Sequence, residues 1–172
     1  CRCGRRSVRY DLMGAVPTRA EAWELIQRYI DSPSLRNHCQ AVEAVMRAEA
    51  QAAGCDPEPW GVIGLVHDLD WERFPQEHCH KTEEILKEAG WPADYIRAAI
   101  SHGWKICIDV EPESLLERTL YAIDELVGFV TACALVRPSK SVTDLEVKSV
   151  RKKWKQKGFA SGVDRSVIER GC

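Results

Sequence analysis

The stretch WGVIGLVHDL, residues 60–69, decides the fold. Pro57 and Pro59 lie just before this stretch, and proline is typical of a first helical turn. Residues 60–66 are apolar or glycine around the whole circumference of a helix, a pattern typical of a helix buried on most sides. The first polar residues of the stretch are His67 and Asp68 near its end, and on a helix their side chains point about 100° apart. We therefore expect a buried helix that ends in a histidine and an aspartate.

Helical patterning extends from this stretch in both directions. Thr18 with Glu21, and Thr143 with Glu146, are spaced as capping boxes, and Ser32 precedes a proline as a helix cap does. No alternating pattern of useful length indicates a β-strand. The expected helices cover about residues 18–30, 33–53, 57–68, 78–89, 92–103, 113–136, 143–158 and 164–172. The sequence predicts an all-α fold of seven to eight helices, with one domain over residues 16–172.

The composition is that of an ordinary globular chain. Of the 172 residues, 45% are apolar and 29% are charged, and the net charge of −2 gives no general attraction to nucleic acid or anionic membranes. No apolar run approaches the roughly 18 to 20 residues of a membrane span. Residues 1–15 are basic without an apolar centre, so we expect a disordered or gene-start extension and not a secretory signal. We expect a cytoplasmic protein without nucleic-acid or membrane partners, and a homodimer is compatible with the sequence.

The eight cysteines show no metal-binding or disulfide spacing. Five are scattered singly, mostly within helical patterns, and no Cys-x-x-Cys pair occurs. These five are Cys39, Cys55, Cys79, Cys107 and Cys133. We expect buried thiols in a reducing compartment.

All five histidines lie between residues 38 and 102. His38 shares a helical face with Val42 and Met46, so it is expected to point inward. Asp124 borders the apolar row of the longest expected helix, where a buried carboxylate must protonate, pair with a base or hold a cation. Imidazole and carboxylate are ligands of divalent transition metals, so we predict a metal site. An ion pair from another helix is the alternative for Asp124.

Helical spacing also separates two neighbouring histidines. His78 shares a face with Thr82 and Ile85, whereas His80 shares one with polar residues. We therefore expect His78 to be a ligand and His80 to be solvated. His102, at the end of a short expected helix, could face the same cleft.

At these residues the sequence resembles the HD-domain superfamily of metal-dependent phosphohydrolases, in its small single-domain subgroup. The resemblance covers residues 18–172 and is carried by NHCQAVEAVMR (37–47), GLVHDLDWERFPQEH (64–78), AISHGW (99–104) and AIDELVGFVTACALVRPSKS (122–141). The resemblance implies a primary site of His38, His67, Asp68 and Asp124. It also implies a second ion at His78 and His102, with Asp68 bridging the two.

The resulting expectation is a phosphohydrolase that cleaves a small phosphoester, for example a nucleotide, through a metal-activated hydroxide. Asp68 and His67 would be the catalytic residues, and the two divalent ions could be Mn, Fe, Mg, Zn or Ni. Basic residues that could contact the phosphoester are Arg137, Lys140, Lys148 and Lys152, although a solvated helix face is the alternative for the last two. Surface roles are expected for Asp70 and Glu72, with orientation of water or a leaving group as the alternative. Core packing is expected for Trp71, Trp91 and Trp104, with stacking on a base as the alternative.

Two other functions are compatible with the same ligands. Histidine and carboxylate also suit iron, so a mixed-valent di-iron oxygenase of HD type is one alternative. The other is a non-catalytic protein that binds metal or a small ligand.

Overall fold

A computed structural model describes residues 16–171, so the extension expected over residues 1–15 lies outside the described part of the chain. Within residues 16–171 there are eight α-helices, two short 3₁₀ turns and no β-strand, which confirms the all-α prediction. The helices are α1 (Arg19–Tyr29), α2 (Pro33–Ala52), α3 (Pro57–Val66), α4 (His80–Glu88), α5 (Ala93–Ile100), α6 (Leu115–Leu135), α7 (Val147–Trp154) and α8 (Arg165–Gly171). None of these helices is long and apolar enough to cross a membrane.

The chain divides into two compact units, and the boundary falls inside α6, between Tyr121 and Ala122. Unit 1 contains α1 to α5 and the start of α6. Unit 2 contains the rest of α6 together with α7 and α8.

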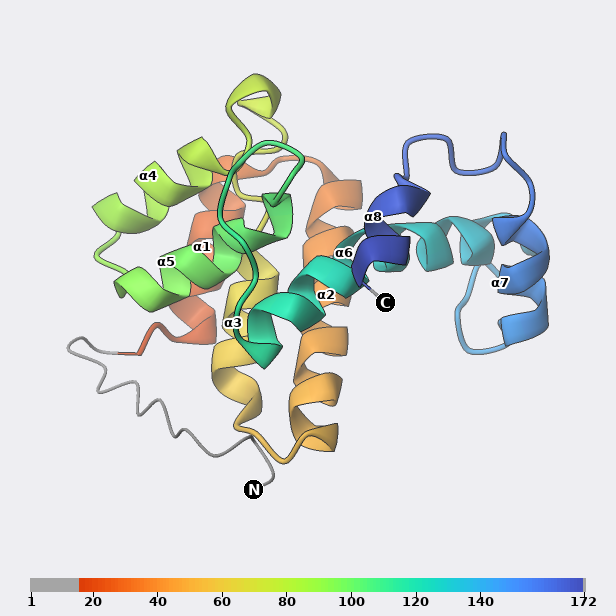
Figure 1. Cartoon of the computed structure of the whole chain (residues 1–172), viewed down its shortest axis with the longest axis horizontal. Helices are drawn as coiled ribbons and strands as arrows, with labels where there is room; N and C mark the ends of the chain where they lie inside the picture. Colours follow the sequence, from red (N-terminus) through yellow and green to blue (C-terminus); the bar gives the residue numbers. More distant parts are fainter. Residues whose placement is uncertain (1–15, 172) are drawn as a thin grey trace. The chain divides into compact units, whose positions relative to one another are not determined.

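Helix α3 is the centre of unit 1, as its all-round apolar sequence predicts. It packs against α1, α2 and α5, and its residues 60–66 are all buried. Helices α2 and α3 lie side by side (Figure 1). A Cβ atom at Gly64 would lie 2.9 Å from Cγ of Met46 on α2, and one at Gly61 would overlap the Arg47 side chain. The two glycines therefore let α2 approach the last turns of α3.

The predicted caps at the start of unit 1 are present. Thr18 and Glu21 form a complete capping box at α1. The Ser32 hydroxyl accepts a hydrogen bond from the Leu35 amide at the start of α2. These caps satisfy amides that the first helical turn leaves without a partner.

Unit 2 has its own apolar cluster, formed by Phe129, Cys133 and Ile168. The predicted capping box of Thr143 and Glu146 is wrong. Helix α7 begins at Val147, Glu146 is its N-cap without a side-chain cap bond, and the Thr143 hydroxyl bonds to that of Ser141. The serine two residues earlier offers Thr143 a local partner, and the chain stays in a turn.

Candidate metal centre

The imidazoles of four histidines converge on one carboxylate in unit 1. His67 caps the end of α3, and Asp68 follows it in the turn that closes the helix. His67 is fully buried, and Asp68 is 8% exposed. His38 reaches the same place from α2, and it is partly exposed.

The two oxygens of the Asp68 carboxylate face two different histidine pairs. Oδ2 lies 3.6 Å from Nε2 of His38 and 3.3 Å from Nε2 of His67. Oδ1 lies 3.7 Å from Nε2 of His78 and 3.5 Å from Nε2 of His102. Within the pairs, the Nε2 atoms of His38 and His67 are 3.3 Å apart, and those of His78 and His102 are 3.1 Å apart. The carboxylate therefore lies between two histidine pairs, with one oxygen toward each pair.

Hydrogen bonds at Nδ1 fix which ring nitrogen can bind a metal. Nδ1 of His67 donates to the Gly64 carbonyl at 2.9 Å, and Nδ1 of His102 donates to the Ala99 carbonyl at 2.6 Å. In a neutral imidazole the proton on Nδ1 leaves the lone pair on Nε2. Both Nε2 lone pairs therefore point into the cluster, as in metal sites where the distal nitrogen is tied to a second group.

The donor spacing fits divalent ions. Ligands bound at about 2.0–2.2 Å lie roughly 2.8–3.6 Å apart in octahedral or tetrahedral sites. The distances within each histidine pair and to Asp68 run from 3.1 to 3.7 Å. Neutral imidazole and carboxylate are ligands for zinc, iron, nickel and manganese. The residues of unit 1 thus fit a metal centre.

The charge of Asp68 suits the same purpose. Burial raises the pKa of this carboxyl, but the protonated forms of His67 and His102, by their charge and their hydrogen bonds from Nε2, hold it well below its usual range; a bound cation would take the place of those Nε2 protons. Asp68 is therefore a carboxylate at neutral pH, which is the form that binds a cation.

His78 is buried and His80 is exposed, as expected, but the two residues do not lie on opposite faces of one helix as predicted. Helix α4 begins only at His80. His78 lies in the segment before it, and the intervening Cys79 has φ 67°. This backbone conformation, rare for a residue with a side chain, separates the two histidines.

Asp70 holds His78 in place, so the expected surface role for this aspartate is wrong. Asp70 is fully buried, and its Oδ1 accepts a 2.7 Å hydrogen bond from Nδ1 of His78. Its Oδ2 accepts a second bond from the Thr82 amide in the first turn of α4. Burial lowers the pKa of His78, but the bond to Asp70 and the charges of Asp68 and Asp70 raise it above its usual value. In the sequence, Asp70 is marked only by its position two residues after Asp68.

Glu72 has a different role from Asp70. It is exposed, and its carboxylate accepts hydrogen bonds from the amides of Asp31 and Ser32, at the start of α2. Glu72 therefore ties the turn after α3 to the helix that carries His38, as a surface residue.

His102 lies in the 3₁₀ turn Ser101–Gly103 that continues α5, and it is 3% exposed. The turn is followed by a tight loop in which the Gly103 carbonyl accepts hydrogen bonds from the amides of Cys107 and Ile108. The loop returns Cys107 to Gly103, so that Sγ of Cys107 lies 3.3 Å from Sγ of Cys79. All five cysteines within the described range are thiols, and Cys39, Cys79 and Cys133 are buried.

The remaining predicted site residues belong to unit 2. Asp124 lies on α6, one turn after Leu120 of unit 1 on the same continuous helix, and its place in the ligand set stays a prediction. The contact of the four basic residues with a phosphoester also stays a prediction. Arg137 is paired with Asp144 at 2.8 Å, Lys148 is paired with Glu146 at 2.7 Å, and Lys140 and Lys152 are exposed.

The three tryptophans have different environments. Trp91 is 8% exposed, as expected for core packing. Trp71 is 50% exposed, so core packing is wrong for this residue; its ring meets that of His78 edge-on with centroids 4.8 Å apart. Trp104 is half-buried against Tyr121.

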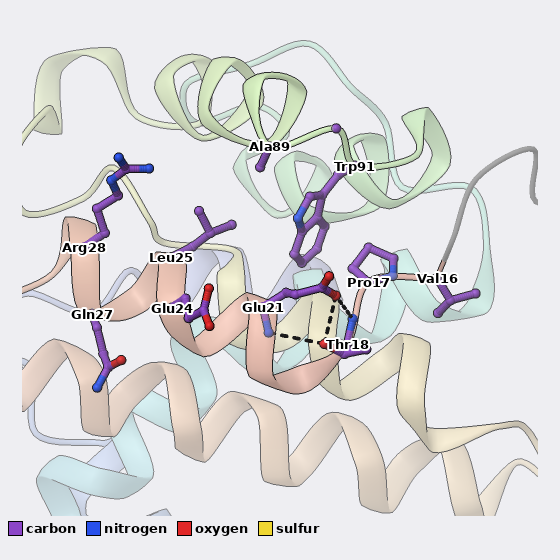
Figure 2. Close-up of a pocket in the computed structure, with 11 residues that line it drawn as sticks. Val16, Pro17, Thr18, Glu21, Glu24, Leu25, Gln27, Arg28, Ala89 and Trp91 are labelled. Carbon is purple, nitrogen blue, oxygen red and sulfur yellow. Dashed lines mark hydrogen bonds between the residues drawn. The ribbon is translucent and has the colours of Figure 1, made fainter.

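A surface pocket of about 880 Å³ lies elsewhere in unit 1, between α1 and the turn after α4. Figure 2 shows Glu21, Glu24 and Arg28 on one side of it and Trp91 on the other. No histidine lines this pocket. Its two acidic residues on the exposed face of α1 do not form a site of their own.

No protein-family model matches this sequence, and no curated protein or solved structure matches it.

Proposed function

We propose that this protein is a metal-dependent phosphohydrolase of HD-domain type that cleaves a small phosphoester. The observation that carries the proposal is the Asp68 carboxylate, whose two oxygens face the His38–His67 pair and the His78–His102 pair separately. Asp124 is proposed as the remaining ligand beside His38 and His67. When bound, two divalent ions would polarise a phosphoryl group and lower the pKa of the attacking water.

The residues of the chain set up this chemistry in three ways. The Nδ1 bonds of His67, His78 and His102 orient the imidazoles before any ion arrives. Burial of Asp68 makes its charge act in a medium of low polarity, where it attracts a cation more strongly. The exposed ring of Trp71 beside His78 is proposed to contact the organic part of the substrate, as an aromatic side chain can stack on a base.

A phosphate-release assay tests this function. The purified protein is incubated with a panel of nucleotides and other phosphorylated metabolites, with manganese, magnesium or iron(II) added in turn. We expect phosphate release from at least one compound, and we expect Asp68→Ala to abolish it. His80→Ala is the matched control, because His80 is an exposed histidine close to the cluster, and it should keep full activity.

Two outcomes would contradict the proposal. Hydrolysis that survives Asp68→Ala would place the reaction elsewhere. A protein that holds iron, consumes dioxygen and is inert on every phosphoester would be a di-iron oxygenase instead.

A further inference from the structure

A sulfur atom lies beside the second histidine pair. Cys79 follows His78 directly, and its fully buried Sγ is 3.9 Å from Nε2 of His102. That Nε2 is itself 3.1 Å from Nε2 of His78. The ligand atoms of His78, Cys79 and His102 all lie within 4.8 Å of one another. One ion could therefore contact all three.

These distances fit a tetrahedral ion. Zinc binds nitrogen at about 2.0–2.1 Å and sulfur at about 2.3 Å, which places two nitrogens about 3.3 Å apart and a nitrogen about 3.6 Å from a sulfur. The observed 3.1 Å and 3.9 Å differ from these values by a few tenths of an ångström. Oδ1 of Asp68 lies 3.7 Å and 3.5 Å from the two Nε2 atoms, so it could complete the coordination on the histidine side.

The surrounding backbone is shaped for sulfur at this position. Cys79 has φ 67°, a conformation that costs free energy for a residue with a side chain and is found where the surroundings hold it in place. A Cβ atom at Gly103 would collide with Sγ of both Cys79 and Cys107, so only glycine leaves room for the two sulfurs. Cys107 is half-buried, and its Sγ lies 3.3 Å from Sγ of Cys79, within reach of a hydrogen bond to a Cys79 thiolate.

We propose that Cys79 is a thiolate ligand of the ion held by His78, His102 and Asp68. This position would then take zinc or iron(II) in preference to magnesium or manganese, because thiolate is a soft ligand. On binding, a sulfur–metal bond forms and the thiol proton leaves to solvent, without oxidation or reduction. Cys107 is a positioning residue that donates to the bound thiolate. The inference rests on the metal centre of the proposed function and not on hydrolysis.

X-ray absorption at the zinc edge of zinc-loaded protein tests the assignment. The wild type should show a sulfur shell at about 2.3 Å beside the nitrogen and oxygen shell. Cys79→Ser should lose the sulfur shell, whereas Cys107→Ser should keep it, since that hydroxyl can still donate. In competition titrations, the preference of the wild type for zinc over manganese should fall in Cys79→Ser and persist in Cys107→Ser. If Cys79→Ser does not fold, the wild-type and Cys107→Ser spectra together decide the question, because a sulfur shell that persists without the Cys107 thiol belongs to Cys79.

The failures of the two proposals are distinguishable. Zinc bound by nitrogen and oxygen alone would overturn the thiolate ligand and leave the metal centre in place. A disulfide between Cys79 and Cys107 in the zinc-loaded wild type would also overturn it. Protein that binds no zinc would overturn the metal centre and the thiolate together. A sulfur shell in protein that hydrolyses no phosphoester would support the thiolate and count against the phosphohydrolase.

Discussion

Nδ1 of His78 donates a 2.7 Å hydrogen bond to Oδ1 of Asp70, and both residues are buried. The bond leaves Nε2 of His78 as the nitrogen that faces His102 and Asp68. Because Asp70 also accepts from the Thr82 amide, the first turn of α4 is joined to the cluster through one carboxylate.

Asp70→Asn should therefore weaken the second ion. The amide keeps the shape of the side chain but loses the charge that orients His78, and loss of such a partner lowers metal affinity by about 10–100-fold. Calorimetric titration with zinc measures the effect. Glu77→Gln is the control. Glu77 is exposed, so this substitution should leave the affinity for zinc unchanged at both positions. Equal affinities in Asp70→Asn and wild type would show that Asp70 only supports the fold.

Gly103→Ala should destabilise unit 1. The added methyl group would meet the sulfurs of Cys79 and Cys107, and overpacking of this kind costs about 1–3 kcal/mol. Urea denaturation measures the free energy of unfolding. Gly158→Ala, where a Cβ has no neighbour within 4 Å, should change it by less than about 0.5 kcal/mol. Combining Gly103→Ala with Cys79→Ala should recover part of the loss; no recovery would mean that the sulfurs are not the obstacle.

Glu117 should make stability depend on pH. Burial raises its pKa, but the amides of Ser114 and Glu113 and the Arg97 guanidinium together lower it. A carboxyl whose pKa is lowered in the folded protein contributes its full stabilisation at pH values above its ordinary pKa of 4.5. This contribution is lost as the pH falls through the lowered pKa. Glu117→Gln should thus cost about 1–3 kcal/mol at pH 7, with a difference from wild type that shrinks below pH 4.5.

The control for Glu117 is its neighbour Glu113. Its side chain also pairs with Arg97, at 3.1 Å, but it is 77% exposed. Glu113→Gln should change the free energy of unfolding by less than about 0.5 kcal/mol both at pH 7 and at pH 4, as expected of an exposed ion pair. A Glu117→Gln effect that is constant from pH 7 to pH 4 would contradict the assigned shift.

Lys152 tests the interpretation of the basic helix α7. If this exposed lysine contacts the phosphoester, Lys152→Ala should lower kcat/KM by about 10–100-fold, since a charge-assisted bond is worth about 1.5–3 kcal/mol. The effect should appear mainly in KM, with metal content unchanged. Lys157→Ala, at another exposed lysine, is the control. Identical kinetics in the two variants would mean that α7 simply presents a solvated face.

The sequence predicted the helices well because their patterns are local. Thr18 with Glu21, and the apolar stretch before His67, are each readable within one or two turns. The inward position of His38 follows from the periodicity of α2, and Asp68 is marked by its position directly after His67 at the end of α3. The Thr143 capping box failed because a serine two residues earlier competes for the same hydroxyl.

The rest of the site depends on contacts that periodicity does not encode. Asp70 is buried because the chain turns sharply after α3 and brings it under Thr82. Cys79 and Cys107 meet only because the loop after Gly103 folds back. His78 is buried through the unusual backbone at Cys79, which a helical pattern starting at His78 does not predict.

The number of metal ions bound per chain is the decisive measurement for the metal centre. Wild-type protein, Asp68→Ala and His80→Ala are saturated with zinc or manganese, freed of excess ion and measured by mass spectrometry of the metals. Because Asp68 faces both histidine pairs, we predict two ions per chain in wild type and His80→Ala, and loss of at least one ion in Asp68→Ala. A wild type without bound metal, or an Asp68→Ala variant that keeps two ions, would contradict the account.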